Sequence, residues 1–190
     1  MKNIFVDLGA YNGDSIKEFL NIGKSKPSQS FLENVTLPVD PSLFEIYAFE
    51  PNPKFKDCFN EFNNVTFSNK VALTYDGMAT FAIDQTNDPL GSTAESSKVS
   101  IYDTMPHEEI ECFDFSNWIK QFSKDYVIVK MDIEGSEFPI LYKMISEGTH
   151  KIMSKLWVEM HPNKARSYTT TDSINLVERL RQDIEVEYWH

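Results

Sequence analysis

Strand-length apolar runs that alternate with helix-like segments constrain the fold of this chain most strongly. The runs at 3–8, 45–50 and 126–132 each carry a carboxylate at or beside their last position. The run at 126–132, YVIVKMD, is apolar almost throughout, which is typical of a parallel strand covered on both faces. Apolar residues at helical spacing follow each of the three runs. This alternation predicts an α/β fold, with a doubly wound, mostly parallel sheet of the Rossmann-like kind.

Further strands and helices complete the predicted fold. Strand-like runs lie at 65–74, 78–83, 155–161 and 184–188. Helical spacing marks the segments after Gly13, at 51–62, at 137–145 and at 172–182. Asp14 or Ser15 is expected to cap the first of these helices. In the last helix, the residues expected to face the core are Ile174, Val177 and Leu180.

The length of 190 residues suits one domain, and no repeat or low-complexity tract divides the chain. We therefore predict a single domain over residues 1–190. Two irregular segments interrupt the pattern, a long insertion at 23–43 and a loop at 84–98 that is rich in Ser and Thr. Loops of this length in a compact domain are often lids or binding loops, so we expect the insertion to be lid-like.

The net charge of −11 excludes two broad classes of partner. Nucleic-acid binding relies on Lys and Arg that neutralise phosphates, so we expect no nucleic-acid partner. An anionic membrane surface would repel the chain, and no apolar stretch is long enough to cross a bilayer. Cys58 and Cys112 are too few for a disulfide framework. Because no signal peptide is evident either, we expect reduced thiols in a cytoplasmic protein.

The segment VDLGAYNGD at 6–14 places two glycines and two carboxylates around the end of the first predicted strand. In an open α/β sheet, ligands bind beyond the carboxyl ends of the strands, where the strand order reverses. Gly9 and Gly13 let the backbone turn sharply and approach a ligand closely. Glu50 ends the second predicted strand, where an acid can accept hydrogen bonds from both ribose hydroxyls. These features favour a nucleoside site over a simple strand-to-helix turn.

The turn itself narrows the choice of nucleoside. A dinucleotide fingerprint, G-x-G-x-x-G, needs a middle glycine to admit a pyrophosphate, and Tyr11 stands at that position. No phosphate-binding loop of the Gly-Lys-Ser/Thr kind follows a predicted strand. S-adenosylmethionine lacks phosphates and carries a positive sulfonium and ammonium group, for which Asp7 and its acidic surroundings are suitable partners.

Four motifs in sequence order, FVDLGAYNGDS, YAFEPNP, NKVAL and VKMDIEGSEFPIL, resemble those of FkbM-type S-adenosylmethionine-dependent methyltransferases. The resemblance runs from about residue 4 to residue 161, and KMDIEGSE is its most specific part. It implies a class I methyltransferase fold and O-methylation of a hydroxyl on a sugar or another small metabolite. The implied partner is therefore a small hydroxylated acceptor, such as a carbohydrate.

The resemblance also implies roles for individual residues. Glu50 would hold the ribose of the cofactor, and Val71 and Ala72 would lie near its adenine. The segment GSTAESS resembles the family's Gly-Ser segment, so the loop at 84–98 is expected on the acceptor side, with Ser92 and Thr93 as substrate contacts. The residues expected at the methionine end of the cofactor are Asp7, Gly9, Ala10, Asn12, Gly13 and Asp14.

The sequence departs from the family pattern in three places. It begins directly at the first predicted strand, it carries the long 23–43 insertion, and it ends after one C-terminal strand where the class I fold has an antiparallel pair. We therefore expect a shortened strand pair, whose missing strand is absent, displaced or supplied by another chain. Because another chain could supply the missing strand, a homo-oligomer is one of the alternatives.

Methyl transfer to a hydroxyl needs an aligned acceptor and a base that takes its proton. Asp132 and Glu134 follow the central strand, and Glu159 and His161 end the neighbouring one, so all four are expected in one polar cluster. His161 is the predicted base, because an imidazole titrates near neutrality; the alternative is a structural histidine before Pro162. Asp132 is expected to bind the amino group of the cofactor or to act as base.

Other residues near the predicted site have simpler interpretations. Glu134 is a candidate catalytic group, and the alternative is a helix or turn cap. Glu137 is expected to be a first-turn acid that interacts with the helix dipole. Lys130 lies within an apolar strand and is expected to pair with an acid as a structural residue.

A divalent cation is a further alternative, because hard ions prefer oxygen ligands and Asp132, Glu134 and Glu159 could supply them. Clusters of acids arise easily in so acidic a chain, so no metal is the favoured prediction. Two other functions stay open beside methyl transfer. One is a nicotinamide-dependent oxidoreductase, which Tyr11 disfavours, and the other is a catalytically silent cofactor-binding module.

Overall fold

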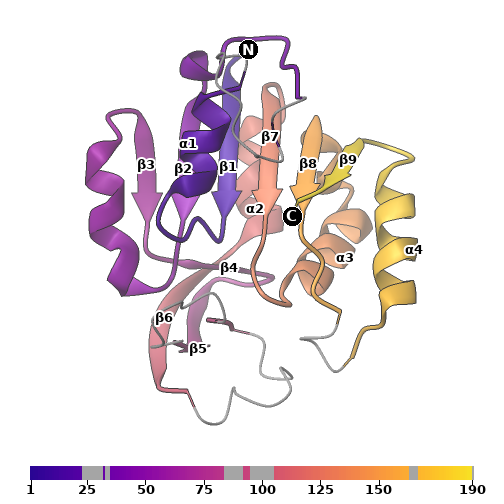
Figure 1. Ribbon diagram of the computed structural model, residues 1–190. Coiled ribbons are helices and arrows are strands. Elements are labelled where there is room, and N and C mark those ends of the chain that lie inside the picture. The colour runs from indigo at the N-terminus through magenta and orange to yellow at the C-terminus, as the bar shows by residue number, and fades with distance from the viewer. Residues whose placement is uncertain (23–31, 33–34, 84–91, 95–104, 163–166, 190) are drawn as a thin grey trace.

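A six-stranded sheet forms the centre of the computed structural model, which describes residues 1–22, 32, 35–83, 92–94, 105–162 and 167–189 (Figure 1). Its order is β3-β2-β1-β7-β8-β9, and every neighbouring pair is parallel. The predicted doubly wound α/β fold is therefore confirmed. The strands are β1 (Asn3–Leu8), β2 (Glu45–Phe49), β3 (Val65–Ser68), β7 (Tyr126–Met131), β8 (Lys155–Val158) and β9 (Glu185–Tyr188).

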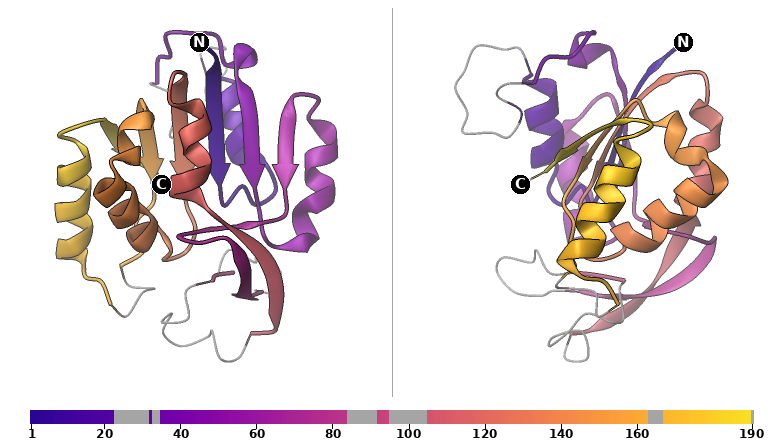
Figure 2. Two further views of the ribbon diagram at one scale, coloured as in Figure 1. Left: turned by 180° about the vertical axis from the view of Figure 1, so that it is seen from behind. Right: turned by 90° about the vertical axis from the view of Figure 1, so that its right-hand side faces the viewer.

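Helices cover both faces of this sheet, as the two further views show (Figure 2). Alternate residues of β1 serve different cores: Ile4 and Val6 pack with α2, α3 and α4, whereas Phe5 packs with α1 and η3. Both faces of the strand therefore carry apolar side chains that pack into a core, as a strand covered on both faces requires. The helices are α1 (Asp14–Leu20), η2 (Pro41–Leu43), η3 (Pro53–Glu61), α2 (Phe115–Trp118), η5 (Ile119–Phe122), α3 (Glu137–Glu147), η6 (Thr149–Ile152) and α4 (Thr170–Leu180).

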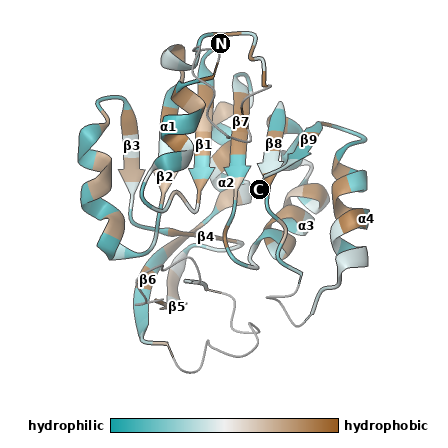
Figure 3. Ribbon diagram, in the orientation of Figure 1, coloured by the Kyte–Doolittle hydropathy of each residue, from teal (hydrophilic) through white to brown (hydrophobic). Residues whose placement is uncertain are grey.

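The strand order reverses between β1 and β7. From β1 the chain proceeds outward through β2 to β3, and from β7 it proceeds the other way through β8 to β9. Hydrophobic residues gather along these central strands, and hydrophilic residues colour the outer surface of the helices (Figure 3). The carboxyl ends of β1 and β7 are thus the place where an open α/β sheet binds its ligand.

A second, three-stranded sheet lies beyond the carboxyl ends of the first (Figure 1). It consists of β4 (Val71–Leu73), β6 (His107–Asp114) and β5 (Gly77–Ala82), with β6 in the middle. The strand predicted at 65–74 therefore divides into β3 and β4, which belong to different sheets. β6 was not predicted from the sequence, because its first three residues are exposed and polar and only its second half is mostly buried.

Three expectations about helices need correction. Gly13, in the left-handed conformation, is the N-cap of α1, and neither Asp14 nor Ser15 caps it. The segment at 51–62 contains the 3-10 helix η3 rather than an α-helix. Ile174 of α4 is 51% exposed, and the residues that face the core from this helix are Leu176, Val177 and Leu180.

The predicted end of β8 needs correction, and the predictions for the two irregular segments stay predictions. β8 ends at Val158, so Glu159 and His161 follow the strand and are not its last residues, contrary to the prediction from the run at 155–161. The predicted lid at 23–43 and the loop at 84–98 lie largely outside the described residues, which include only 32, 35–43 and 92–94 of them. None of the helices in the described ranges has the length and apolar character needed to span a bilayer.

Candidate active site

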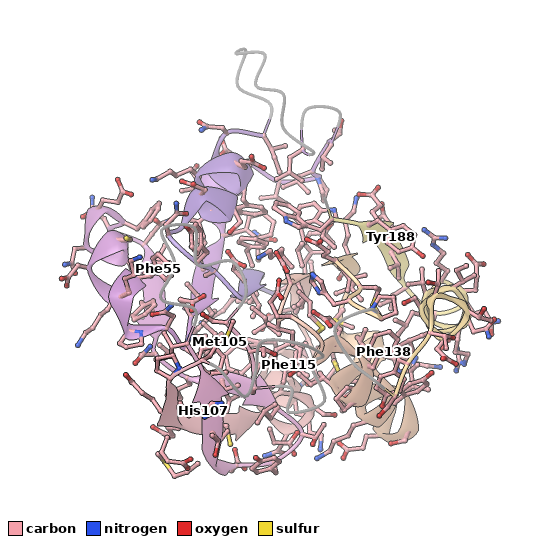
Figure 4. All side chains as sticks on the ribbon, turned by 60° about the horizontal axis from the view of Figure 1, so that its bottom comes forward. Phe55, Met105, His107, Phe115, Phe138 and Tyr188 are labelled. Atoms are coloured by element: carbon pink, nitrogen blue, oxygen red, sulfur yellow. The ribbon has the colours of Figure 1, made fainter. Side chains whose placement is uncertain are left out.

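A cavity of about 250 Å³ opens at the carboxyl ends of the central strands. Figure 4 views the molecule with this edge turned forward, with Phe55 of η3 and Phe138 of α3 on opposite sides. The turn after β1, the ends of β2, β7 and β8, and the small sheet all contribute to its wall. Eight residues that the sequence predicted for a site line this cavity, namely Gly9, Glu50, Val71, Ala72, Ser92, Asp132, Glu134 and Glu159.

Other predicted site residues lie behind or beside the cavity wall. Asp7 and Ala10 are buried, and the amide of Ala10 donates to Phe49 O (3.1 Å). Asn12 and Asp14 hydrogen-bond one another near the protein surface at the start of α1 (2.8 Å). Gly13 faces the ring of Phe62, where a Cβ would approach to 2.9 Å. Cofactor contacts by these residues stay predictions.

Gly9 marks the closest approach between the β1 turn and the loop after β7. Its φ is +77°, and a Cβ at this position would lie 1.8 Å from Asp132 O. The amides of Gly9 and Ala10 both donate to Phe49 O (3.0 and 3.1 Å), which ties the same turn to β2. A glycine is therefore required here both by the backbone conformation and by the lack of space.

We expect Gly9→Ala to destabilise the protein about 1–3 kcal/mol more than Gly148→Ala does. Gly148 is a matched control, because its φ of +74° is similar while a Cβ there meets nothing within 4 Å. The loss of stability in Gly148→Ala therefore reflects only the cost of a left-handed backbone at a residue other than glycine, about 1–2 kcal/mol. Urea unfolding of both variants measures the difference, and equal losses would contradict the close approach to Asp132.

Glu50 is a buried acid at the end of β2, with both carboxylate oxygens facing backbone donors. The amide of Asn52 donates to Oε1 (2.7 Å), and the amide of Tyr11 donates to Oε2 (2.9 Å). Burial raises the pKa of Glu50 to about 7, although these two hydrogen bonds oppose the shift. Each oxygen can accept one more hydrogen bond, so the carboxylate can still accept hydrogen bonds from hydroxyl groups of a ligand.

Lys130 and Asp7 form a buried pair at the adjacent ends of β7 and β1. Lys130 Nζ lies 3.3 Å from Asp7 Oδ1 and donates to Gly9 O (2.7 Å), and Asp132 Oδ2 lies 3.7 Å away. Ser15 Oγ donates to the other oxygen of Asp7. Burial alone would lower the pKa of Lys130, but the carboxylates of Asp7 and Asp132 outweigh it and raise the pKa above its usual value. The structural role expected for Lys130 agrees with this pairing.

His161 lies among four carboxylates. Its Nδ1 is 2.9 Å from Glu137 Oε1. Its Nε2 faces Glu159 Oε1 at 3.4 Å, Glu134 Oε1 at 3.6 Å and Asp132 Oδ1 at 3.8 Å. Because the last three residues line the cavity, Nε2 is directed toward its wall. The structure thus brings the four residues of the predicted polar cluster together.

Glu137 is the first-turn acid of α3 that the sequence predicts, but its contacts extend beyond the helix. It is the first residue of α3, but its side chain is fully buried and its carboxylate accepts hydrogen bonds from the amides of Ile133 and Gly135 (2.9 Å each). The loop after β7 therefore wraps around this carboxylate. The signal available in the sequence was the spacing in EGSE, which places an acid where the helix begins behind a strand-end loop.

Thr93 connects the small sheet to the same loop. Its backbone pairs with Ala82 of β5, and its hydroxyl donates to Glu134 O (2.9 Å). Glu134 has a φ of +60°, which is uncommon for a residue other than glycine and costs about 1–3 kcal/mol. Thr93 is fully buried and does not line the cavity, so its predicted substrate contact stays a prediction.

A metal could be held at one place in the described part of the chain. Donor atoms of Asp132, Glu137 and His161 lie within 4.8 Å of one another, a different set from the predicted Asp132, Glu134 and Glu159. Glu137 already accepts two amide hydrogen bonds and contacts His161. An ion bound there would displace that contact, and the predicted absence of a metal stays a prediction.

Comparisons with known proteins give one family and one structural neighbour. The family model described as Methyltransferase FkbM domain matches residues 7–182. A crystal structure of Methyltransferase FkbM from Methylobacillus flagellatus KT is similar, with a TM-score of 0.49 and 17% sequence identity over 96% of this chain. The match covers only 38% of that longer chain. No curated protein matches.

Proposed function

The chain belongs to the FkbM methyltransferase family, and we propose that it transfers a methyl group from S-adenosylmethionine to a hydroxyl of a sugar or another small metabolite. The observation that carries this proposal is the cavity at the strand-order reversal. A glycine turn, a buried acid and a histidine–carboxylate cluster meet around it, from the ends of four neighbouring strands. These are the parts that a nucleoside cofactor and a hydroxyl acceptor require.

The residues of the cavity fit S-adenosylmethionine in shape and charge. The buried carboxylate of Glu50 would accept from the ribose hydroxyls, and the apolar wall at Val71 and Ala72 would face the adenine. Among the charged residues of the lining, Lys70 is basic and the other four are acidic, namely Glu50, Asp132, Glu134 and Glu159. Such a lining suits a cofactor with a positive sulfonium and ammonium group. When bound, the cofactor supplies an electrophilic methyl group.

His161 does not itself line the cavity, so its Nε2 would take the proton of the acceptor hydroxyl through one of the three cavity-lining carboxylates that it faces. Its Nδ1 is held by Glu137, so the other ring nitrogen is directed to the cavity wall. An imidazole titrates close to neutral pH and is suited to general base catalysis. Ser92 and Glu159 line the same cavity and are the candidate contacts of the acceptor.

Two other functions compete with this proposal. A nicotinamide cofactor would bring a pyrophosphate to the β1 turn, where the side chain of Tyr11 lines the cavity and its ring centroid lies 4.3 Å from that of Phe55. Calorimetric titration with S-adenosylmethionine, S-adenosylhomocysteine and NAD compares the candidates. Micromolar affinity for NAD with none for the sulfur cofactors would reverse the assignment. If the protein binds the cofactor but forms no S-adenosylhomocysteine with any sugar of a broad panel, the catalytically silent module would be favoured.

The affinity for S-adenosylhomocysteine should rise with pH until the pH passes about 7, the pKa of Glu50. Below this value Glu50 is protonated in the free protein, and ribose hydroxyls donate best to the ionised form. Glu50 must therefore release its proton when the ligand binds below this pH. The Kd should increase up to about tenfold for each pH unit below 7. Calorimetry from about pH 5.5 to about pH 8.5 measures this dependence.

Glu50→Gln is the control for this pH dependence. A glutamine keeps the shape of the side chain but does not titrate, so Kd should be weaker and nearly constant over the same range. A wild-type affinity that does not vary with pH would contradict the placement of the ribose at Glu50. A dependence that persists in Glu50→Gln would assign the titration to another group.

A further inference from the structure

We infer that Glu137 is a positioning residue for His161, an inference that rests on the proposed methyl transfer. Glu137 holds the imidazole in the tautomer with the proton on Nδ1, so that Nε2 keeps its lone pair toward the carboxylates of the cavity wall. The residue itself does not line the cavity. Its effect on the acceptor hydroxyl therefore acts through His161.

The hydrogen bonds of Glu137 determine which ring nitrogen carries the proton. Its Oε1 accepts from the amide of Ile133 and lies 2.9 Å from His161 Nδ1, while its Oε2 accepts from the amide of Gly135. Backbone amides can only donate, and an ionised carboxylate can only accept. His161 Nδ1 must then be the donor in its contact with Glu137. In a neutral imidazole this leaves the lone pair on Nε2.

The distances around Nε2 support the same orientation. The three carboxylates that it faces are 3.4 to 3.8 Å away, longer than an ordinary N–H···O hydrogen bond. The contact with Glu137 is shorter, at 2.9 Å, and it is fully buried on the carboxylate side. Glu137 is therefore the stronger constraint on the ring than Asp132, Glu134 or Glu159.

The carboxylate of Glu137 thus connects the loop after β7 to His161, the proposed base. The amides of Ile133 and Gly135 flank Glu134, so the same group that orients His161 also supports the left-handed residue of the loop. A purely structural role would involve the loop bonds alone. The two roles differ in one measurable property, the position of the proton on the imidazole.

Long-range ¹H–¹⁵N correlation spectra of uniformly ¹⁵N-labelled protein measure that property directly. The chain has four histidines, and the His161 signals can be assigned from their loss in His161→Gln. The spectra are recorded at alkaline pH, where a neutral imidazole carries a single ring proton. We expect the Nδ1–H tautomer in the wild-type protein. An Nε2–H tautomer would overturn the inference, and this measurement does not depend on how a Glu137 variant folds.

Glu137→Gln tests whether the carboxylate is the cause. A glutamine cannot accept from both loop amides and from the imidazole as a carboxylate does, so the Nε2–H tautomer should become populated. The kcat should fall roughly 10- to 100-fold, and the KM for S-adenosylmethionine should change less than about twofold. An unchanged tautomer or an unchanged kcat in the folded variant would overturn the inference.

Glu147→Gln is the matched control. Glu147 ends the same helix and contacts Ser116 and Lys120 away from the cavity, so its replacement should leave both the tautomer and kcat as in the wild type. A protein that binds no sulfur cofactor and transfers no methyl group would refute the proposed function. The tautomer would still be readable in that case, so the two failures are distinguishable.

Discussion

Lys130→Met should destabilise the protein by about 3–5 kcal/mol, because it leaves a buried carboxylate without its counter-charge. Asp7 is fully buried, and Lys130 Nζ is its ionic partner at 3.3 Å. Methionine has a similar length and fills the apolar part of the space, so packing changes little. The substitution also removes the hydrogen bond to Gly9 O, which connects β7 to the turn after β1. Urea unfolding measures the loss.

The double variant Asp7→Asn/Lys130→Met is the control for this first prediction. It removes both charges, and asparagine can still accept the hydrogen bond from Ser15 through its amide oxygen. We expect the double variant to recover most of the stability lost in Lys130→Met. If the two variants were equally unstable, the loss would belong to the methionine or to the bond to Gly9, and the buried pair would not be its cause.

His161→Gln should lower kcat for methyl transfer by roughly 10²–10⁴-fold, the range expected for loss of a general base. The Kd for S-adenosylhomocysteine should change little, because His161 lies behind the carboxylates that line the cavity. Single-turnover assays of S-adenosylhomocysteine release, together with calorimetry, separate the two quantities. The pH dependence of kcat, measured at saturating cofactor so that Glu50 does not contribute, should lose its acidic limb in the same variant.

His107→Gln is the matched control for this second prediction, because His107 is an exposed residue at the start of β6 and is not among the residues that line the cavity. It should keep the wild-type kcat. Full activity in His161→Gln would exclude this residue as the base. A loss of cofactor affinity as large as the loss of kcat would indicate a disturbed cavity in place of a missing base.

The sequence analysis predicted the central strands well, because their signals are local. The runs that became β1, β2 and β7 are strand-length and apolar, and their end points differ from the predicted ones by at most one residue. The acids at the ends of parallel strands must meet at one edge of the sheet, so the convergence of Glu50 and Asp132 on one cavity followed from topology alone. Weakly apolar segments such as β6 carried no comparable signal.

Residues beside the cavity were harder to interpret, because their roles depend on partners far away in sequence. An acid at the start of a helix, such as Glu137, has the same local pattern whether it faces solvent or holds a histidine 24 positions later. Thr93 reads as part of a polar loop, although its hydroxyl supports the carbonyl of Glu134. His150 is buried and pairs with Asp183, which lies 33 residues later in the chain, and no local pattern in the sequence indicates this contact.

By itself, the sequence determined the fold class, the order of the central strands along the chain and the chemical groups at their ends. It did so because periodicity and strand length are properties of neighbouring residues. Tertiary structure alone decided which of those groups are buried, how Lys130 neutralises Asp7, and which carboxylate orients His161. These outcomes depend on distances between separate loops and on the loss of water around each charge, and neither quantity is encoded in local spacing.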